Sequence, residues 1–255
     1  MKKISIFLII LVLATMQLSC RKEEIAETPT PIPPARSTAT PTTTPALKDE
    51  TQNKPVFADI TDFESGNNAY EYGFANYNES KDSVYELTSN IQDIPDNSSK
   101  GLFMSGNNQS ESLLMYLSKS IVALPDAQYT VKIDFDIATN LVNNVDDGNN
   151  NGQAMYVKAG VTTVPFSTII DGKDFVRTNL DLGSLVNSGP DGRTLGTVEK
   201  VNSEDESYQY RHFTQSFRVT TKEDGLISIL IAVESNISGV SSLYFDNIII
   251  ELAEE

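Results

Sequence analysis

The feature that most constrains the fold is an alternation of apolar and polar side chains with a period of two residues. The stretch YTVKIDFDI, residues 129–137, shows it clearly: Tyr129 and every second residue after it are apolar, and the residues between them are polar. Because successive side chains of a strand point to opposite faces, this pattern predicts a strand with one buried face. The stretches MYVKAGVTTV (155–164) and FTQSFRVTT (213–221) repeat it. No long stretch has the 3.6-residue period of an amphipathic helix.

Two later stretches, GLISILIAVES (225–235) and SSLYFDNIIIEL (241–252), are apolar on both faces, which is typical of central strands. Turn sequences such as NSGPDG (187–192) and KEDG (222–225) separate the strand patterns. Many short strands at this spacing predict one all-β domain over residues 56–255. The expected fold is an antiparallel β-sandwich of the jelly-roll type, which follows a disordered Pro/Thr-rich linker.

The N-terminal segment has the organisation of a secretory signal. Two lysines precede an apolar run from Ile4 to Ala14, which is too short to span a bilayer as a helix. Ser19-Cys20 follows, and here the chain resembles a bacterial lipoprotein signal. The resemblance implies that residues 1–19 are removed and that Cys20, the only cysteine, is lipidated, for example with palmitate. The alternatives are an ordinary secreted protein and an uncleaved anchor.

Arg21-Lys22-Glu23-Glu24 resembles the signal that follows the lipidated cysteine in surface-exposed lipoproteins of Bacteroidetes. It implies a membrane partner through the lipid anchor and a location on the bacterial outer membrane, facing outward. Residues 20–55 are then the lipidated N-terminus and a Pro/Thr-rich tether. This segment has too little apolar content to offset the entropy of ordering, so we expect it to be disordered and extended.

Charge and motif content narrow the function classes. The formal net charge is −16, which repels phosphate backbones and excludes nucleic acid as a favoured partner. Motifs of the P-loop, HExxH and GxSxG types are absent. The single histidine, His212, lies in a strand pattern and is expected to be a strand-face residue. We therefore predict no catalytic residue, and a protein without catalysis is favoured over an enzyme.

Two acidic positions stand out at the two ends of the domain: Glu64 in DITDFESG and Asp246 in LYFDNIIIEL. The alternation places Asp246 on a face with Ile248 and Ile250, where a carboxylate is costly unless it has a partner. These segments resemble galactose-binding-like and carbohydrate-binding-module-like jelly rolls, which open with F-E-x-G and close with Y-x-D-[ND]-[IV]. The resemblance implies a structural Ca²⁺ held by Glu64 and Asp246, with Asp59 or Asp62 as a third ligand. The alternative is a hydrogen bond to each carboxylate.

A third resemblance covers nearly the whole domain. The blocks DFESG, FANY, YEL, GLFMSGNNQSESLLMY, IATN, MYVKAG, TNLDLG and LYFDNI occur in this order. They resemble a family of secreted and lipid-anchored bacterial proteins with a GLFxSGNNxS block. The resemblance implies the fold and secretion, and it implies no reaction.

Within that block we predict a turn at Gly106-Asn107-Asn108, where glycine and asparagine tolerate a positive φ. Asn107 and Asn108, together with tyrosines, would suit a sugar ligand that stacks and hydrogen-bonds. The candidate tyrosines are Tyr70, Tyr72, Tyr208 and Tyr210.

The predicted function is a surface-anchored lipoprotein that presents a non-catalytic jelly-roll module for glycans. Two alternatives stay open. The first is a structural or adhesion protein that binds another envelope or host protein, and the second is a carboxylate-dependent glycoside hydrolase.

Overall fold

The computed structural model describes residues 56–66, 69–109, 112–143, 151–201 and 207–255. Cys20, the predicted signal and the predicted tether lie outside the described residues. Within the described part, strands dominate, and the longest helix is the four-residue α1 (Asp82–Tyr85). None of the described helices has the length and apolar character needed to cross a bilayer.

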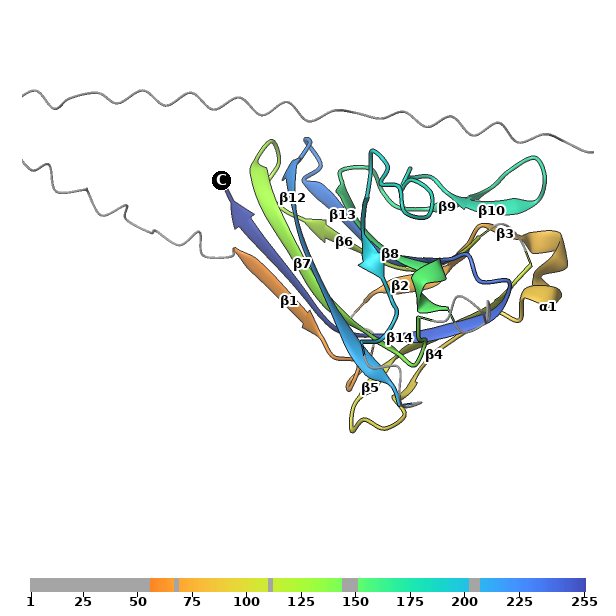
Figure 1. Cartoon of the computed structure of the whole chain (residues 1–255). Coiled ribbons are helices and arrows are strands. Elements are labelled where there is room, and N and C mark those ends of the chain that lie inside the picture. The colour runs from red at the N-terminus through yellow and green to blue at the C-terminus, as the bar shows by residue number, and fades with distance from the viewer. Residues whose placement is uncertain (1–55, 67–68, 110–111, 144–150, 202–206) are drawn as a thin grey trace, which may run out of the picture. The chain divides into compact units, whose positions relative to one another are not determined.

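The first sheet has the order β12-β7-β14-β5-β4, and β1 pairs with the other end of β14 (Figure 1). Its strands are β1 (Phe57–Thr61), β4 (Thr88–Asp93), β5 (Lys100–Asn108), β7 (Gln128–Thr139), β12 (Gln209–Thr220) and β14 (Gly239–Glu254). All pairings in this sheet are antiparallel.

The second sheet has the order β11-β8-β13-β6-β2 and is also antiparallel. Its strands are β2 (Glu71–Ala75), β6 (Leu113–Val122), β8 (Met155–Thr162), β11 (Arg193–Thr197) and β13 (Leu226–Ser235). From β5 to β8 the chain changes sheet at each strand, and it does so again from β12 to β14. These crossings are those of a jelly roll, so the predicted antiparallel β-sandwich is confirmed.

The core lies between the two sheets and explains the alternating sequence patterns. Val131, Ile133, Phe135 and Ile137 of β7 are fully buried in the same cluster as Ile229 and other inward residues of β13. The polar residues of β7 that alternate with them lie on the outer side of the first sheet. The period-two pattern of residues 129–137 thus describes one buried and one outward face, as predicted.

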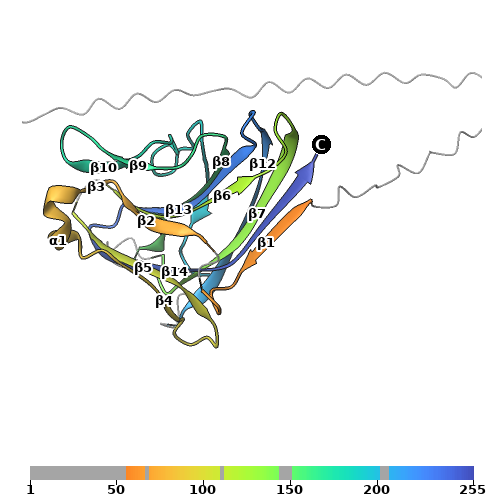
Figure 2. The ribbon, with the colours of Figure 1, turned by 180° about the vertical axis from the view of Figure 1, so that it is seen from behind.

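A three-stranded third sheet lies on the outer side of the second sheet (Figures 1 and 2). It contains β3 (Tyr77–Asn78), β9 (Thr168–Ile170) and β10 (Phe175–Thr178). Residues from β10 and the chain after it pack against the outward residues of the second sheet; this cluster contains Ala75, Leu114, Val176, Leu180, Leu182, Leu230 and Ala232. The covering explains why β13 is apolar on both faces.

The chain that follows β10 also encloses an ion pair between Lys158 and Glu234 against the second sheet. Their side chains are 1% and 5% exposed, and Nζ lies 3.4 Å from Oε2. Lys158 also donates to the carbonyl oxygens of Leu182 and Asn187, and Glu234 accepts the N–H of Leu185 at 2.7 Å. Burial lowers the pKa of Lys158 below its ordinary value, and the Glu234 charge opposes that shift. The pair joins the segment 182–187 to the second sheet.

A β-bulge in β14 corrects the predicted facing of Asp246. The register with β7 shifts between Asp246 and Ile249, and Asn247 has a φ of 49°. Asn tolerates this left-handed conformation better than most residues. The extra residue returns Ile248 to the core, whereas Asp246 lies on the outer side. The expectation that Asp246 shares a face with Ile248 and Ile250 is therefore wrong.

The predicted turn at Gly106-Asn107-Asn108 is also wrong, because β5 continues through Asn108. All three residues pair with β14, Asn108 being opposite Gly239. Gly106 is needed for close packing rather than for a turn, because a Cβ there would lie 2.5 Å from Cδ2 of the buried Leu113.

Candidate functional site

The outer side of the first sheet carries a connected group of polar side chains around Tyr210. We call it the Tyr210 patch, and it consists of Ser99, Asp136, Tyr210, His212, Asp246 and Asn247. Except for Ser99, which precedes β5, its residues come from three neighbouring strands, because β12 pairs with β7 and β7 pairs with β14. In register, His212 is opposite Asp136, and Asp136 is opposite Asp246. Directly opposite residues on one sheet face lie close enough for their side chains to interact.

Asp246 is the buried member of the patch, with 1% exposure. Its Oδ2 accepts the Tyr210 hydroxyl at 2.7 Å, and its Oδ1 accepts the Asn247 N–H at 2.8 Å. Burial raises the pKa of Asp246; the two hydrogen bonds oppose this, and the charges of Asp136 and Glu64 add to it. A carboxylate so placed fixes its neighbours and does not reach solvent.

Tyr210 is 37% exposed, and its hydroxyl is held by two partners. It donates to Asp246, and the hydroxyl of Ser99 lies 2.7 Å from the same oxygen, where it can donate. Burial is the main cause that raises the pKa of Tyr210 to about 12, and Asp246 contributes. The phenol is therefore neutral at physiological pH, and its ring is held in one orientation while part of it stays exposed.

Asp136 links the two outer strands of the patch. One of its oxygens lies 2.9 Å from Nδ1 of His212, and the other accepts the side-chain amide of Asn247 at 2.9 Å. The His212 side chain is 63% exposed, as expected for a strand-face residue. Asn247 reaches Asp136 because the β-bulge turns its side chain outward. The bulge thus places an amide at the centre of the patch.

An aromatic cluster lies beside the patch. The ring of Tyr244 packs edge-on against Tyr208, with centroids 5.3 Å apart, and lies 5.1 Å from the ring of Phe103. The Tyr244 hydroxyl accepts the side-chain amide of Gln92 at 2.9 Å. Tyr208 is half-buried, whereas Tyr244 is only 3% exposed. Of the predicted tyrosines, the structure therefore brings Tyr208 and Tyr210 to the same face.

The other predicted ligand residues do not join them. Tyr70 is buried in the core and Tyr72 packs against it. Asn108 is 3% exposed and donates its amide to the carbonyl oxygen of Ser235 at 3.1 Å, while Asn107 accepts the side chain of Gln109. Asn108 is thus used in packing the sandwich.

The predicted calcium ligands are only partly brought together. Glu64 lies near enough to Asp246 for its charge to affect the carboxyl, but its Oε1 accepts the N–H of Lys100 at 2.7 Å. Asp59 faces the inner side of the first sheet and pairs with Lys119 at 2.8 Å, because it lies opposite the core residue Ile250. No group of three or more His, Cys, Asp or Glu in the described part of the chain could hold a metal ion. Ca²⁺ takes six to eight oxygen ligands, of which Glu64 and Asp246 would be only two residues' share.

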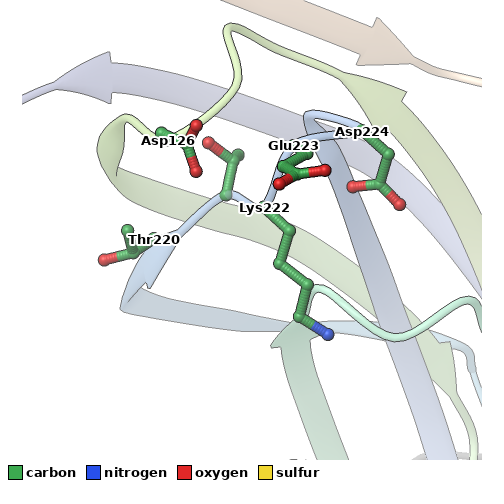
Figure 3. A pocket seen from close by; sticks show the side chains of 6 residues that line it. Asp126, Thr220, Lys222, Glu223 and Asp224 are labelled. Atoms are coloured by element: carbon green, nitrogen blue, oxygen red, sulfur yellow. The ribbon is translucent and has the colours of Figure 1, made fainter.

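A separate hollow of about 700 Å³ lies at the opposite end of the sandwich, where two turns meet (Figure 3). Asp126 comes from one turn, and Thr220, Thr221, Lys222, Glu223 and Asp224 from the other. The polar groups serve the turns: Thr221 donates to Leu124 O, and Asp224 accepts the N–H of Leu226. Local turn chemistry accounts for this cluster.

No sequence pattern marks Asn247 or Ser99 as a site residue. Asp136 was readable as an outward strand residue, but its pairing with His212 depends on the register of β12 against β7. Asn247 lies in the bulge, and Ser99 precedes β5. The weak signal was the Asp-Asn pair in a late apolar strand.

The fold and the patch define an antiparallel β-sandwich domain with a polar and aromatic surface on one sheet. No protein-family model and no curated protein matches the sequence.

Solved structures that resemble the domain include the CBM22-1 xylan-binding domain of Paenibacillus barcinonensis Xyn10C, with 12% identity, TM-score 0.38, and coverage of 79% of this chain and 98% of that one. The K1 cleaved adhesin domain of Lys-gingipain from Porphyromonas gingivalis W83 has 12% identity, TM-score 0.38, and coverage of 76% and 97%. A carbohydrate-binding module that recognises mannan, TmCBM27, has 12% identity, TM-score 0.37, and coverage of 77% and 96%. All three are remote in sequence and in structure.

Proposed function

We propose that this chain is a lipid-anchored surface lipoprotein whose β-sandwich domain binds glycans through the Tyr210 patch without catalysing a reaction. The observation that carries the proposal is the exposed ring of Tyr210, which is fixed by Ser99 and Asp246 beside the Asp136–His212–Asn247 network. A sugar offers an apolar face that stacks on an aromatic ring and hydroxyl groups that donate and accept.

The patch is pre-organised for such a ligand. Tyrosine has few rotatable bonds, and two hydrogen bonds to its hydroxyl reduce the entropy lost on binding. Each oxygen of Asp136 has one side-chain partner among the described residues, but an ionised carboxylate can accept about four hydrogen bonds. Sugar hydroxyls can therefore add to the existing network without breaking it.

The experiment starts with uncharged polymers, so that binding is measured without a contribution from the chain's net charge of −16. Xylan and mannan, which are named for two of the structural neighbours, are convenient neutral probes. The proposal itself rests on the Tyr210 patch.

The lipid anchor is the second half of the proposal and rests on the sequence around Cys20. A lipidated N-terminus followed by an extended tether would hold the domain away from the membrane. Radiolabelled palmitate should attach to the wild-type chain and not to Cys20→Ala. Equal labelling of the two proteins would refute the anchor and leave the binding proposal untouched.

Binding is tested with residues 21–255 on a glycan array and then by calorimetry with the best neutral ligand. Tyr210→Ala should weaken binding by about 1–3 kcal/mol, the usual range for losing an aromatic contact. Tyr210→Phe, which keeps the ring, should retain most of the affinity. Tyr156→Ala is the matched control, since Tyr156 is a half-buried tyrosine of β8 in the second sheet.

Each outcome has a meaning for the proposal. Absence of binding across plant, host and bacterial glycans would overturn it. Affinity that is unchanged in Tyr210→Ala would show that another surface binds. Release of sugar products by the wild-type chain would favour the hydrolase alternative, although Asp246 is too buried to contact a substrate directly.

A further inference from the structure

A second cavity lies at the open side of the sandwich, between β12 and the start of β11. It has a volume of about 330 Å³ and is lined by residues 190–193, residues 216–218 and Val161. In the described part of the chain, β12 pairs only with β7, and β11 pairs only with β8. The cavity therefore lies beside two strand edges whose outward backbone groups belong to no sheet.

Two arginines, Arg193 and Arg218, are among the residues that line this cavity. Arg218 donates its Nε–H to Glu255 at 2.9 Å, and Arg193 donates from Nη1 to the carbonyl oxygen of Gly189 at 3.4 Å. A guanidinium has about five N–H donors, so each group keeps most of its donors for another partner. One hydrogen bond on each arginine holds the group in place without using its capacity.

The rest of the lining suits a small organic molecule. Phe217 and Pro190 offer apolar surface, and Ser216 offers a hydroxyl. Asp191 also lines the cavity, but its Oδ2 accepts the N–H of Asp181 at 2.8 Å. The volume is at the lower end of the roughly 300–1,000 Å³ range of small-molecule sites, which corresponds to one or two rings.

We propose that this cavity binds a small carboxylate-bearing ligand, such as a hexuronic acid, whose carboxylate pairs with Arg193 and Arg218. The planar guanidinium fork matches the geometry of a carboxylate, and such charge-assisted pairs are stronger than neutral hydrogen bonds. The overall charge of −16 does not prevent this, because at physiological salt charges beyond about 8 Å are largely screened and the two arginines dominate locally.

This site is separate from the Tyr210 patch. Tyr210 and Ser216 are both in β12, and six residues of strand at about 3.3 Å each place them roughly 20 Å apart. The inference therefore does not depend on the glycan-binding proposal, and variants at the two positions can be tested separately.

The experiment is an NMR titration of uniformly ¹⁵N-labelled residues 21–255 with sodium galacturonate and, in parallel, with galactose. The two sugars share a ring and differ at the carboxylate. Galacturonate should shift the amide signals of Gly192 and Ser216 with a Kd on the order of 1 mM, and galactose should not.

Three variants make the test specific. Arg193→Gln and Arg218→Gln should each weaken galacturonate binding about tenfold, because each removes a charged hydrogen-bond donor. Arg177→Gln is the control: Arg177 is also an exposed arginine with a carboxylate partner, Asp171, but lies in β10. Glu255→Gln should strengthen binding, because it frees Nε of Arg218.

Several results would overturn the proposal. They are equal amide-signal shifts with galactose and galacturonate, an unchanged galacturonate affinity in Arg193→Gln, and no signal shift at a galacturonate concentration of about ten times the expected Kd. Tyr210→Ala must retain galacturonate binding; its loss there would mean that the carboxylate binds at the Tyr210 patch.

Discussion

Replacing Lys158 by Met tests how far the buried ion pair stabilises the packing of residues 182–187 against the second sheet. Methionine keeps the unbranched shape of lysine but removes the charge and the donors to Leu182 and Asn187. The Glu234 side chain is 5% exposed and would keep the Leu185 N–H as a hydrogen-bond donor. The expected result is a large loss of stability, because a buried carboxylate loses its counter-charge.

The magnitude follows from the burial of both partners. Removing one member of a buried pair typically costs about 3–5 kcal/mol. For a domain of this size each kcal/mol lowers the Tm by about 2–4 °C, so the variant should melt about 6–20 °C lower. Total domain stabilities are about 5–15 kcal/mol, so the folded state of Lys158→Met should survive with a reduced margin.

The assay is urea unfolding of residues 21–255, followed by tyrosine fluorescence, since the chain has ten tyrosines and no tryptophan. The double variant Lys158→Met/Glu234→Gln is the informative partner, because glutamine keeps an acceptor for Leu185 and carries no charge. It should recover more than half of the lost free energy of unfolding. Two results would refute the reasoning. One is a loss of less than about 1 kcal/mol in the free energy of unfolding of Lys158→Met, and the other is a loss in the double variant that equals the sum of the losses in the two single variants.

Three further predictions concern the first sheet. The pKa of Asp246 in the folded protein is raised above its ordinary 3.8, so the carboxyl contributes to stability at low pH and loses that contribution as the pH rises through the folded pKa. The wild type should therefore gain stability relative to Asp246→Asn as the pH is lowered from about 7 to about 4. Tm measurements over this range check the prediction, and a constant difference between the two proteins would contradict it. Gly106→Ala should cost about 1–3 kcal/mol in urea unfolding because its Cβ would meet Leu113, whereas Gly172→Ala, which has open space, should be near neutral; equal effects would count against the packing argument. EDTA should leave the Tm unchanged, because Glu64 and Asp246 both have hydrogen-bond partners in the protein; a rise in Tm on adding calcium would instead support the calcium site.

The fold was predictable because the period-two pattern records which face of each strand is buried. Residues 129–137 show this directly. The apolar residues on the outward face of β13 indicated that another part of the chain packs over that face. The sequence did not indicate what covers it, because the third sheet is built from the short strands β3, β9 and β10. Such strands have no apolar alternation to detect.

The site was less predictable, and the reasons are local. Alternation counted through Asp246 fails because one extra residue at Asn247 reverses the facing of all later residues. Gly106-Asn107-Asn108 has the composition of a turn, but Gly106 is required by the approach of Leu113. The contact between His212 and Asp136 depends on pairing across 76 positions, which local patterns do not encode.

The order of strands has a consequence for how the protein is made. β14 is in the middle of the first sheet and β13 in the middle of the second, yet these are the last two strands of the domain to be synthesised. Before β14 is present, β5 and β7 lack the strand that lies between them in the first sheet. Before β13 is present, β6 and β8 lack the strand that lies between them in the second sheet. The sandwich therefore cannot assemble progressively from its N-terminal side, and its edges would wait unpaired for the final segment. This makes the interval before completion the period in which the chain is most exposed to aggregation and in which a chaperone would matter most.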